Sequence, residues 1–67
     1  MTEVTVNGSP WVGPPGTTVG DLVAEWCASP RGIAVARNGA VVSKSSWNAT
    51  RISRGDRIEI VTAAAGG

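Results

Sequence analysis

The sequence predicts a single α+β domain, in which one helix covers one face of a small mixed β-sheet. Its 67 residues suffice for one hydrophobic core. Two Asn-Gly pairs stand between segments of alternating polarity, which is typical of β-hairpins. One segment, 17–28, repeats apolar residues at helical spacing. The predicted order is therefore strand, strand, helix, strand, strand, strand, which places a helix layer on a sheet layer.

The first hairpin is predicted at the Asn-Gly pair at positions 7–8. Val4 and Val6 alternate with polar neighbours before this pair and share one face of a strand. Asn-Gly favours the positive φ angles of a two-residue turn. A short second strand follows around Trp11, and a Pro-Pro-Gly run then ends it.

The helix begins at a predicted capping box. Thr18 is the expected N-cap, and Asp21 lies three residues later in the first turn, where the helix dipole favours an acid. Apolar residues at positions i, i+3, i+4 and i+7 form one face: Val19, Leu22, Val23 and Trp26. Trp26 is therefore predicted to lie in the core, whereas Trp11 and Trp47 are predicted to be half-buried.

The second half of the chain is predicted to contain a second hairpin, at the Asn-Gly pair at positions 38–39. Ile33 and Val35 in its first strand are expected to point into the core. The polar segment after this hairpin is predicted to be irregular, with Trp47 and Ile52 as its anchors.

The last strand is predicted at 58–62, after a tight turn formed by Arg54-Gly55-Asp56. This tripeptide also occurs in cell-adhesion proteins, but a turn leading into a strand explains it here. Ile58 and Ile60 alternate with charged residues, which indicates one buried face. We expect a folded domain over 1–62 and a flexible tail over 63–67.

The composition excludes most classes of enzyme. The chain has no histidine and only five acidic residues, so neither a Ser/His/acid triad nor a histidine-containing metal site can be built. It also has no glycine-rich phosphate loop with its lysine. Cys27, the single cysteine, has no basic neighbour that would activate it and is interpreted as a packing residue. The sequence therefore predicts no metal, no bound cofactor and no catalysis by this chain.

Charge and hydropathy argue against two kinds of partner. The formal net charge is +1, and all six basic residues lie between positions 31 and 57, where Asp56 is the only acid. We interpret these residues as a solvated rim rather than a nucleic-acid site, because no aromatic-rich motif accompanies them. No apolar run approaches the roughly 20 residues of a membrane helix, and no signal-peptide pattern occurs. We expect a cytoplasmic protein that binds neither nucleic acid nor membrane.

The tail is the remaining candidate for chemistry. Its last two residues have no side chains, so its backbone can approach another surface closely. The Gly67 carboxylate is unhindered and could be activated as an acyl-adenylate. The alternative interpretation of the tail is an unstructured end of small residues.

The whole chain resembles the small β-grasp sulfur carriers, ubiquitin-like proteins that end in Gly-Gly, and most closely the ThiS-type carriers of thiamine biosynthesis. The matching pieces are "VNG", "GTTVGDLVAE", "IAVARNGAVV" and "ISRGDRIEIVTAAAGG". The family commonly has Pro-Arg after the fourth strand, where this chain has Ser43-Lys44. The Lys keeps the charge, and the difference does not involve the tail.

The resemblance implies a specific chemistry at the tail. An E1-like adenylating enzyme would use ATP and magnesium, which this chain itself would not bind, to activate the Gly67 carboxylate. Sulfur from cysteine, supplied by a cysteine desulfurase or another donor, would convert it to a thiocarboxylate. Thiazole synthase would accept this sulfur.

The resemblance also implies residues that contact partners. Ala63, Ala64, Ala65 and Gly66 would pass into the active-site channels of both enzymes. The exposed face of the sheet and the basic residues Arg37, Lys44 and Arg57 are candidates for docking.

Three alternatives stay open from the sequence. The chain could carry sulfur for molybdopterin or cysteine synthesis, it could be a ubiquitin-like modifier joined to lysines, or it could be a β-grasp binding module.

Overall fold

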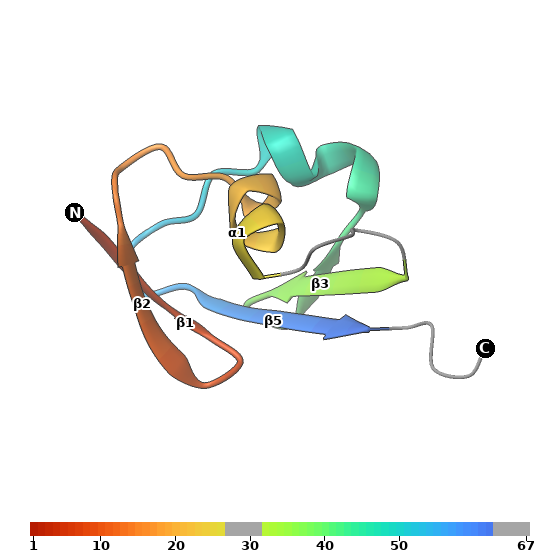
Figure 1. Ribbon diagram of the computed structural model, residues 1–67, viewed down its shortest axis with the longest axis horizontal. Coiled ribbons are helices and arrows are strands. Elements are labelled where there is room, and N and C mark those ends of the chain that lie inside the picture. Colours follow the sequence, from red (N-terminus) through yellow and green to blue (C-terminus); the bar gives the residue numbers. More distant parts are fainter. Residues whose placement is uncertain (27–31, 63–67) are drawn as a thin grey trace.

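The computed structural model describes residues 1–26 and 32–62 (Figure 1). These residues form five strands, an α-helix and a 3₁₀-helix: β1 (Thr2–Val6), β2 (Ser9–Gly13), α1 (Val19–Trp26), β3 (Ile33–Arg37), β4 (Ala40–Val42), η1 (Lys44–Ala49) and β5 (Arg57–Thr62). The strand order is β2-β1-β5-β3-β4. β1 pairs with β5 in parallel, and the other pairs are antiparallel. The predicted α+β arrangement of one mixed sheet and one helix is confirmed.

The two hairpins turn where the sequence predicts. Asn7 and Gly8 have φ angles of 52° and 84°, and Asn38 and Gly39 have φ angles of 53° and 87°. Positive φ at both central residues defines the type I′ turn, whose twist matches that of the flanking strands. Both Asn-Gly pairs therefore act as the sequence analysis expects.

The predicted capping box opens α1. The Thr18 hydroxyl accepts a hydrogen bond from the Asp21 backbone N–H at 3.1 Å, and the Asp21 carboxylate accepts one from the Thr18 N–H at 3.0 Å. These two bonds satisfy backbone donors that a helix start leaves without partners. The local sequence thus marks where the helix begins, and the Val19 N–H, which donates to the Thr50 carbonyl at 2.8 Å, connects this start to the segment after η1.

The prediction that Trp26 lies in the core is wrong, because this residue is 43% exposed. Val19, Leu22 and Val23 are the buried residues of α1. Trp26 lies about 10 Å along the helix axis from Val19. It belongs to the last turn, beyond the part of the helix that packs on the sheet. The predicted helical spacing is confirmed, but the apolar face of the helix extends one turn beyond the residues that the core buries.

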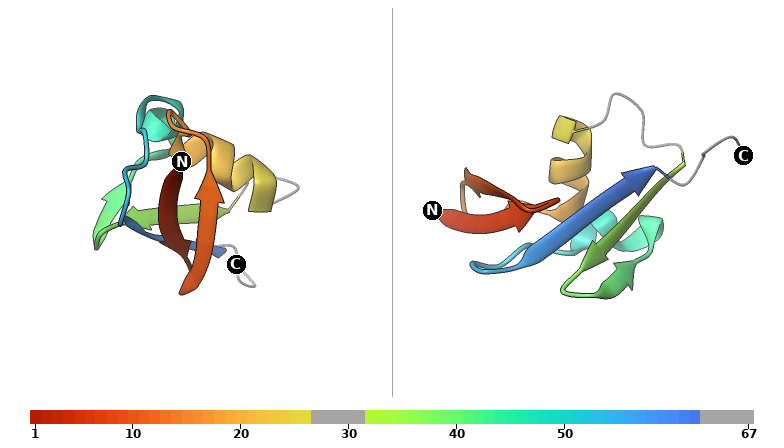
Figure 2. Two further views of the ribbon diagram at one scale, coloured as in Figure 1. Left: turned by 90° about the vertical axis from the view of Figure 1, so that its left-hand side faces the viewer. Right: turned by 90° about the horizontal axis from the view of Figure 1, so that it is seen from below.

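The segment predicted to be irregular instead contains η1. The 3₁₀-helix lies on the same side of the sheet as α1 (Figure 2). Trp47 is only 5% exposed, so it is fully buried rather than half-buried as predicted. Its indole N–H donates to the Val42 carbonyl at 3.0 Å, which allows the ring to be buried without an unsatisfied donor. Ile52 is buried as expected, and Trp11 is half-buried.

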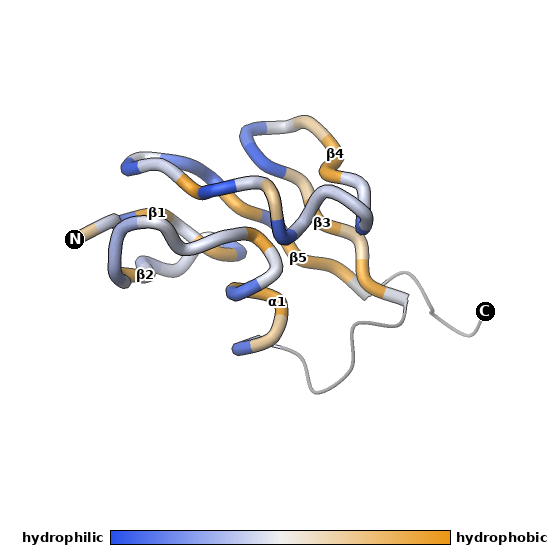
Figure 3. Tube along the Cα trace, turned by 90° about the horizontal axis from the view of Figure 1, so that it is seen from above, coloured by the Kyte–Doolittle hydropathy of each residue, from blue (hydrophilic) through white to orange (hydrophobic). Residues whose placement is uncertain are grey.

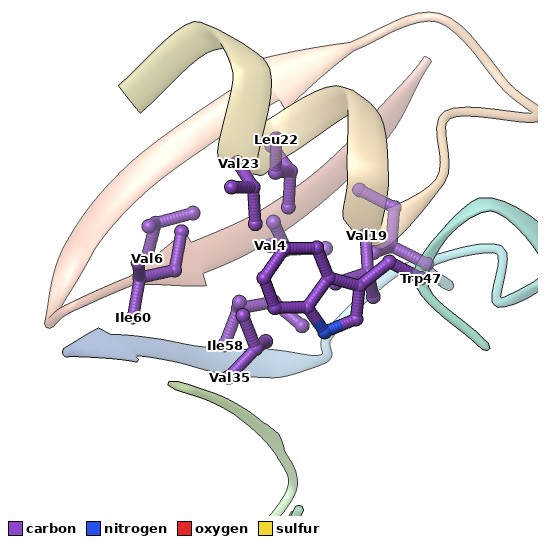
Figure 4. Close-up of a cluster of buried hydrophobic side chains, with 10 residues drawn as sticks. Val4, Val6, Val19, Leu22, Val23, Val35, Trp47, Ile58 and Ile60 are labelled. Atoms are coloured by element: carbon purple, nitrogen blue, oxygen red, sulfur yellow. The ribbon is translucent and has the colours of Figure 1, made fainter. Parts of the chain in front are cut away.

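The core lies between the sheet and the two helices. Side chains from α1 meet those of β1, β3 and β5, and the Trp47 ring closes one end (Figure 4). The buried apolar residues are Val4, Val6, Val19, Leu22, Val23, Val35, Trp47, Ile52, Ile58 and Ile60. Hydrophobic residues are concentrated along β3, β4 and β5, and hydrophilic residues at the turns (Figure 3). β5 is the central strand of the sheet, and its Ile58 and Ile60 belong to the core.

Candidate functional site

The site predicted from the sequence is the tail, and β5 is the strand that leads into it. Gly66, Gly67 and the three alanines before them lie outside the described residues, as does Cys27. The structure therefore describes the base from which the tail leaves the sheet. That base is β5, which pairs with β1 on one edge and with β3 on the other.

On the β1 edge, a side chain extends the pairing of β5. The Asn7 backbone N–H donates to the Ile58 carbonyl at 2.9 Å. The Asn7 side-chain oxygen accepts from the Ile60 N–H at 2.8 Å, and its amide nitrogen donates to the Ile60 carbonyl at 3.1 Å. The two backbone groups of Ile60 are thus both satisfied by one carboxamide.

On the β3 edge, Asn38 binds the start of β5 in a similar way. Its backbone N–H donates to the Arg57 carbonyl at 2.8 Å, and its side-chain oxygen accepts from the Arg57 N–H at 2.9 Å. Both hairpin asparagines therefore bind β5, one on each edge, in addition to providing the positive φ of their turns.

Asp56 connects the turn before β5 to the second hairpin. One carboxylate oxygen accepts from Arg37 Nε at 2.8 Å and from the Ser53 N–H at 2.7 Å, and the other accepts from Asn38 Nδ2 at 3.0 Å. Burial alone raises the pKa of Asp56, but the hydrogen bonds from Asn38, Ser53 and Arg37, together with the Arg37 charge, outweigh it. The pKa of Asp56 therefore lies below its ordinary value, and the ionised form holds this network together.

The three basic residues proposed for docking differ in their surroundings. Arg37 is 33% exposed and forms the ion pair with Asp56, so its guanidinium has a structural partner. Arg57 is exposed and pairs with Thr5, which places its side chain on the sheet face away from α1. Lys44 is exposed at the start of η1, on the helix side of the sheet. The structure therefore does not bring these residues together on one face.

The face of the sheet opposite α1 carries an apolar hollow beside the end of β5. Its volume is about 220 Å³, and Ala34, Ala36, Val41, Glu59 and Val61 contribute to its lining. Val41 is 82% exposed and Val61 55% exposed. Large apolar side chains that share one exposed face are typical of protein-contact surfaces. We call the five residues the open-face patch.

The described residues, 1–26 and 32–62, form neither a metal-binding cluster nor a helix that could span a membrane. No group of three or more His, Cys, Asp or Glu side chains in these residues could hold a metal ion. None of the helices formed by these residues is long and apolar enough to cross a membrane.

Comparison with known proteins decides the family. The chain matches the ThiS family over residues 3–67. The chain belongs to the ThiS family. Its structure is similar to the crystal structure of the thiamine biosynthesis protein ThiS from Geobacter metallireducens, with a TM-score of 0.78, 30% sequence identity, and coverage of 90% of this chain and 91% of that chain. The predicted resemblance to the ThiS-type carriers and the predicted β-grasp fold are therefore confirmed.

A curated relative of this ThiS-family chain is much longer. The chain is 35% identical over 65 residues to the thiazole synthase of Magnetococcus marinus, which covers 97% of this chain and 20% of that protein. The chain thus spans about a fifth of the length of this relative.

The roles of the hairpin asparagines and of Asp56 are not predicted from the sequence. Each Asn is predicted as a turn residue, yet its carboxamide binds a strand that is distant in sequence, 53 residues away for Asn7. Turn chemistry explains an Asn-Gly pair completely, so the sequence carries no signal for this second role. For Asp56, the isolated acid among basic residues was a signal, but it did not identify the partners.

Proposed function

We propose that this chain carries sulfur as a thiocarboxylate on Gly67 and delivers it to a thiazole synthase. The observation that carries the proposal is the ThiS-family match, which extends to residue 67 and so includes the Gly-Gly sequence. The similarity to a thiazole synthase supports that enzyme as the acceptor. The position of β5 supports the proposal further, because the strand that leads into the tail is central in the sheet and pairs with a neighbour on each edge.

The proposed chemistry has two steps before delivery. A partner adenylating enzyme, using ATP and magnesium, joins the Gly67 carboxylate to AMP and releases pyrophosphate. A sulfur nucleophile, originating from cysteine, then attacks the acyl carbon and displaces AMP together with one carboxylate oxygen. In this scheme the chain is a protein substrate of its partners, and its own contribution is to present the tail.

The open-face patch is the proposed docking surface for the adenylating enzyme. Its apolar residues lie beside the end of β5, so a partner bound there would be close to the point where the tail begins. Glu59 within the patch would favour a basic group on the partner. Arg57 lies on the same face and would favour an acidic group, whereas Arg37 is paired with Asp56.

Intact-mass measurement tests the proposal. The protein is incubated with the adenylating enzyme, ATP and a sulfur donor, and we expect the exchange of one oxygen for sulfur. Deletion of Gly67 should abolish this exchange without unfolding the domain, whereas Ala24→Ser, on the exposed side of α1, should not change it. Sulfuration of the truncated chain would show that Gly67 is not the site.

The same experiment distinguishes the alternatives. Covalent ladders on lysines would indicate a protein modifier, and an unchanged mass would indicate a binding module. To identify the product, the gene is deleted in its host: growth restored by thiazole supports the thiamine role, and a requirement for molybdopterin or cysteine instead would contradict it.

A further inference from the structure

Within residues 1–26 and 32–62, the last hydrogen bonds to β5 from the β1 side of the sheet come from a side chain, that of Asn7. The pairing of β1 with β5 covers two positions, Thr5 with Arg57 and Val6 with Ile58. At Asn7 the main chain turns away, with φ at 52°. The Asn7 carboxamide then binds Ile60, two residues further along β5, through both of its backbone groups.

This carboxamide replaces a peptide group. In a parallel ladder, alternate residues of one strand exchange both backbone hydrogen bonds with the neighbouring strand. Ile60 is the next residue after Ile58 whose backbone groups face β1. If β1 continued, its backbone would supply an acceptor and a donor to Ile60. The oxygen and the nitrogen of the Asn7 side chain supply them instead. The ladder is therefore one step longer than the strand itself.

Beyond Ile60, β5 has less support. Val61 and Thr62 pair with Ala34 and Ile33 of β3, while the pairing of β4 with β3 covers only 35–37. Across the described part of the sheet, the end of β5 is thus one half of a two-stranded ribbon. Such ribbons twist more than wider sheets. The contact of Asn7 with Ile60 lies immediately before this ribbon and limits how its twist can vary.

The direction of β5 matters because it sets the direction in which the chain leaves the sheet. Five residues, 63–67, separate Thr62 from the end of the chain. If a partner's channel holds them extended, they span roughly 17 Å, and a change of about 10° in the direction of β5 at Thr62 then moves their end by roughly 3 Å. A displacement of this size at a reacting group reduces the rate of a positioned reaction strongly.

We propose that Asn7 is a positioning residue for sulfur transfer: its carboxamide fixes the direction in which β5 delivers the tail to the partner's active site. This inference rests on the proposed function. Asn7 acts through Ile60 and touches no reacting atom. A purely structural role would instead affect only the stability of the domain.

Asn38 provides a matched control. It occupies the same position of the same turn type, with φ at 53°, and its side chain also binds the backbone of β5. Its contacts are with the Arg57 N–H and the Asp56 carboxylate, at the opposite end of the strand from the tail. Glycine accepts positive φ, so Asn7→Gly and Asn38→Gly each remove a carboxamide and keep the turn.

The experiment measures sulfur transfer from each thiocarboxylate to thiazole synthase, together with the unfolding free energy of each variant. We expect Asn7→Gly to lower kcat by about tenfold with little change in KM, because docking is unchanged and the tail is misdirected. Asn38→Gly should change kcat by less than about twofold. A structural role alone would raise the apparent KM through the unfolded fraction and leave kcat unchanged.

Hydrogen exchange gives a second measurement that does not depend on the partner. The Ile60 amide should exchange faster in Asn7→Gly than in the wild type, and should be unchanged in Asn38→Gly. If Asn7→Gly does not fold, Asn7→Asp replaces it, since Asp keeps the acceptor for Ile60 N–H and loses the donor. Equal kcat values for the Asn7 and Asn38 variants would overturn the inference alone, whereas a wild-type chain that carries no sulfur would overturn the proposed function and the inference with it.

Discussion

Asp56→Asn tests whether one carboxylate holds the start of β5 in place. The substitution keeps the shape of the side chain but puts an NH₂ group opposite donors, which come from Arg37, Ser53 and Asn38. Hydrogen bonds to a charged group contribute about 1.5–3 kcal/mol each, but the Arg37 pair is one-third exposed and contributes less than about 1 kcal/mol. Asn keeps one acceptor oxygen, so the NH₂ group opposes the donors of the other oxygen only, and about one strong hydrogen bond is lost. We therefore expect a loss of about 2–3 kcal/mol at neutral pH, or roughly 10–20 °C in Tm for a domain of this size.

The loss should depend on pH in one direction. The pKa of Asp56 is lower in the folded state than in the unfolded chain, because its hydrogen bonds favour the ionised form. Its stabilising contribution is therefore complete above the unfolded pKa, near about 4, and disappears as the pH falls through the folded pKa. The difference between wild type and Asp56→Asn should be constant from about pH 5 to 8 and should shrink below about pH 4.

Urea denaturation at several pH values measures this difference. Glu59→Gln is the matched control, since it removes an exposed acid of β5 and should change stability by less than about 0.5 kcal/mol. Equal stability of wild type and Asp56→Asn at pH 7 would refute the role of the carboxylate. A difference that persists unchanged at pH 2 would refute its electrostatic origin.

Further substitutions test the packing and the open-face patch. Gly13→Ala places a methyl group against the Trp11 ring and should destabilise the fold by about 2 kcal/mol in urea denaturation, and an unchanged midpoint would contradict this packing. In Gly20→Ala the new methyl group overlaps only with the end of the Asn48 side chain, which is exposed and can rotate, while its contact with the Asn48 backbone is of ordinary length. The helix propensity of Ala should therefore leave stability equal or raise it by up to about 1 kcal/mol, and a clear loss would show that Asn48 is held rigidly. Val41→Asp should leave stability within about 0.5 kcal/mol but weaken calorimetric binding to the adenylating enzyme at least tenfold, and unchanged affinity would remove the open-face patch from the docking surface.

Features that depend on neighbouring residues in the sequence could be predicted. The turns at Asn7 and Asn38 require positive φ, which Asn-Gly provides without help from the rest of the fold. The capping box of Thr18 and Asp21 is likewise complete within four residues. These predictions succeed because the partners of each interaction lie within one turn of chain.

Features that depend on the assembled sheet could not be predicted. The extent of the core decides whether Trp26 is buried, and the apolar pattern of the helix carries no information on that extent. Asp56 pairs with Arg37, which lies 19 residues away in the sequence. The sequence contains several other basic residues that could equally have been its partner. The chemistry of Gly67 stays a prediction, because the sequence and the family support it while the described residues end at 62.

The position of β5 suits the proposed function, in which the tail that follows this strand is presented to a partner enzyme. A terminal strand at the edge of a sheet would be held by one neighbour and would fray first. Here the terminal strand is central, with β1 and Asn7 on one edge and β3 and Asn38 on the other. To separate the tail from the domain, a partner would have to break both sets of hydrogen bonds and expose Ile58 and Ile60. If the proposed function holds, a partner could therefore bind the tail tightly without unfolding the domain that carries it.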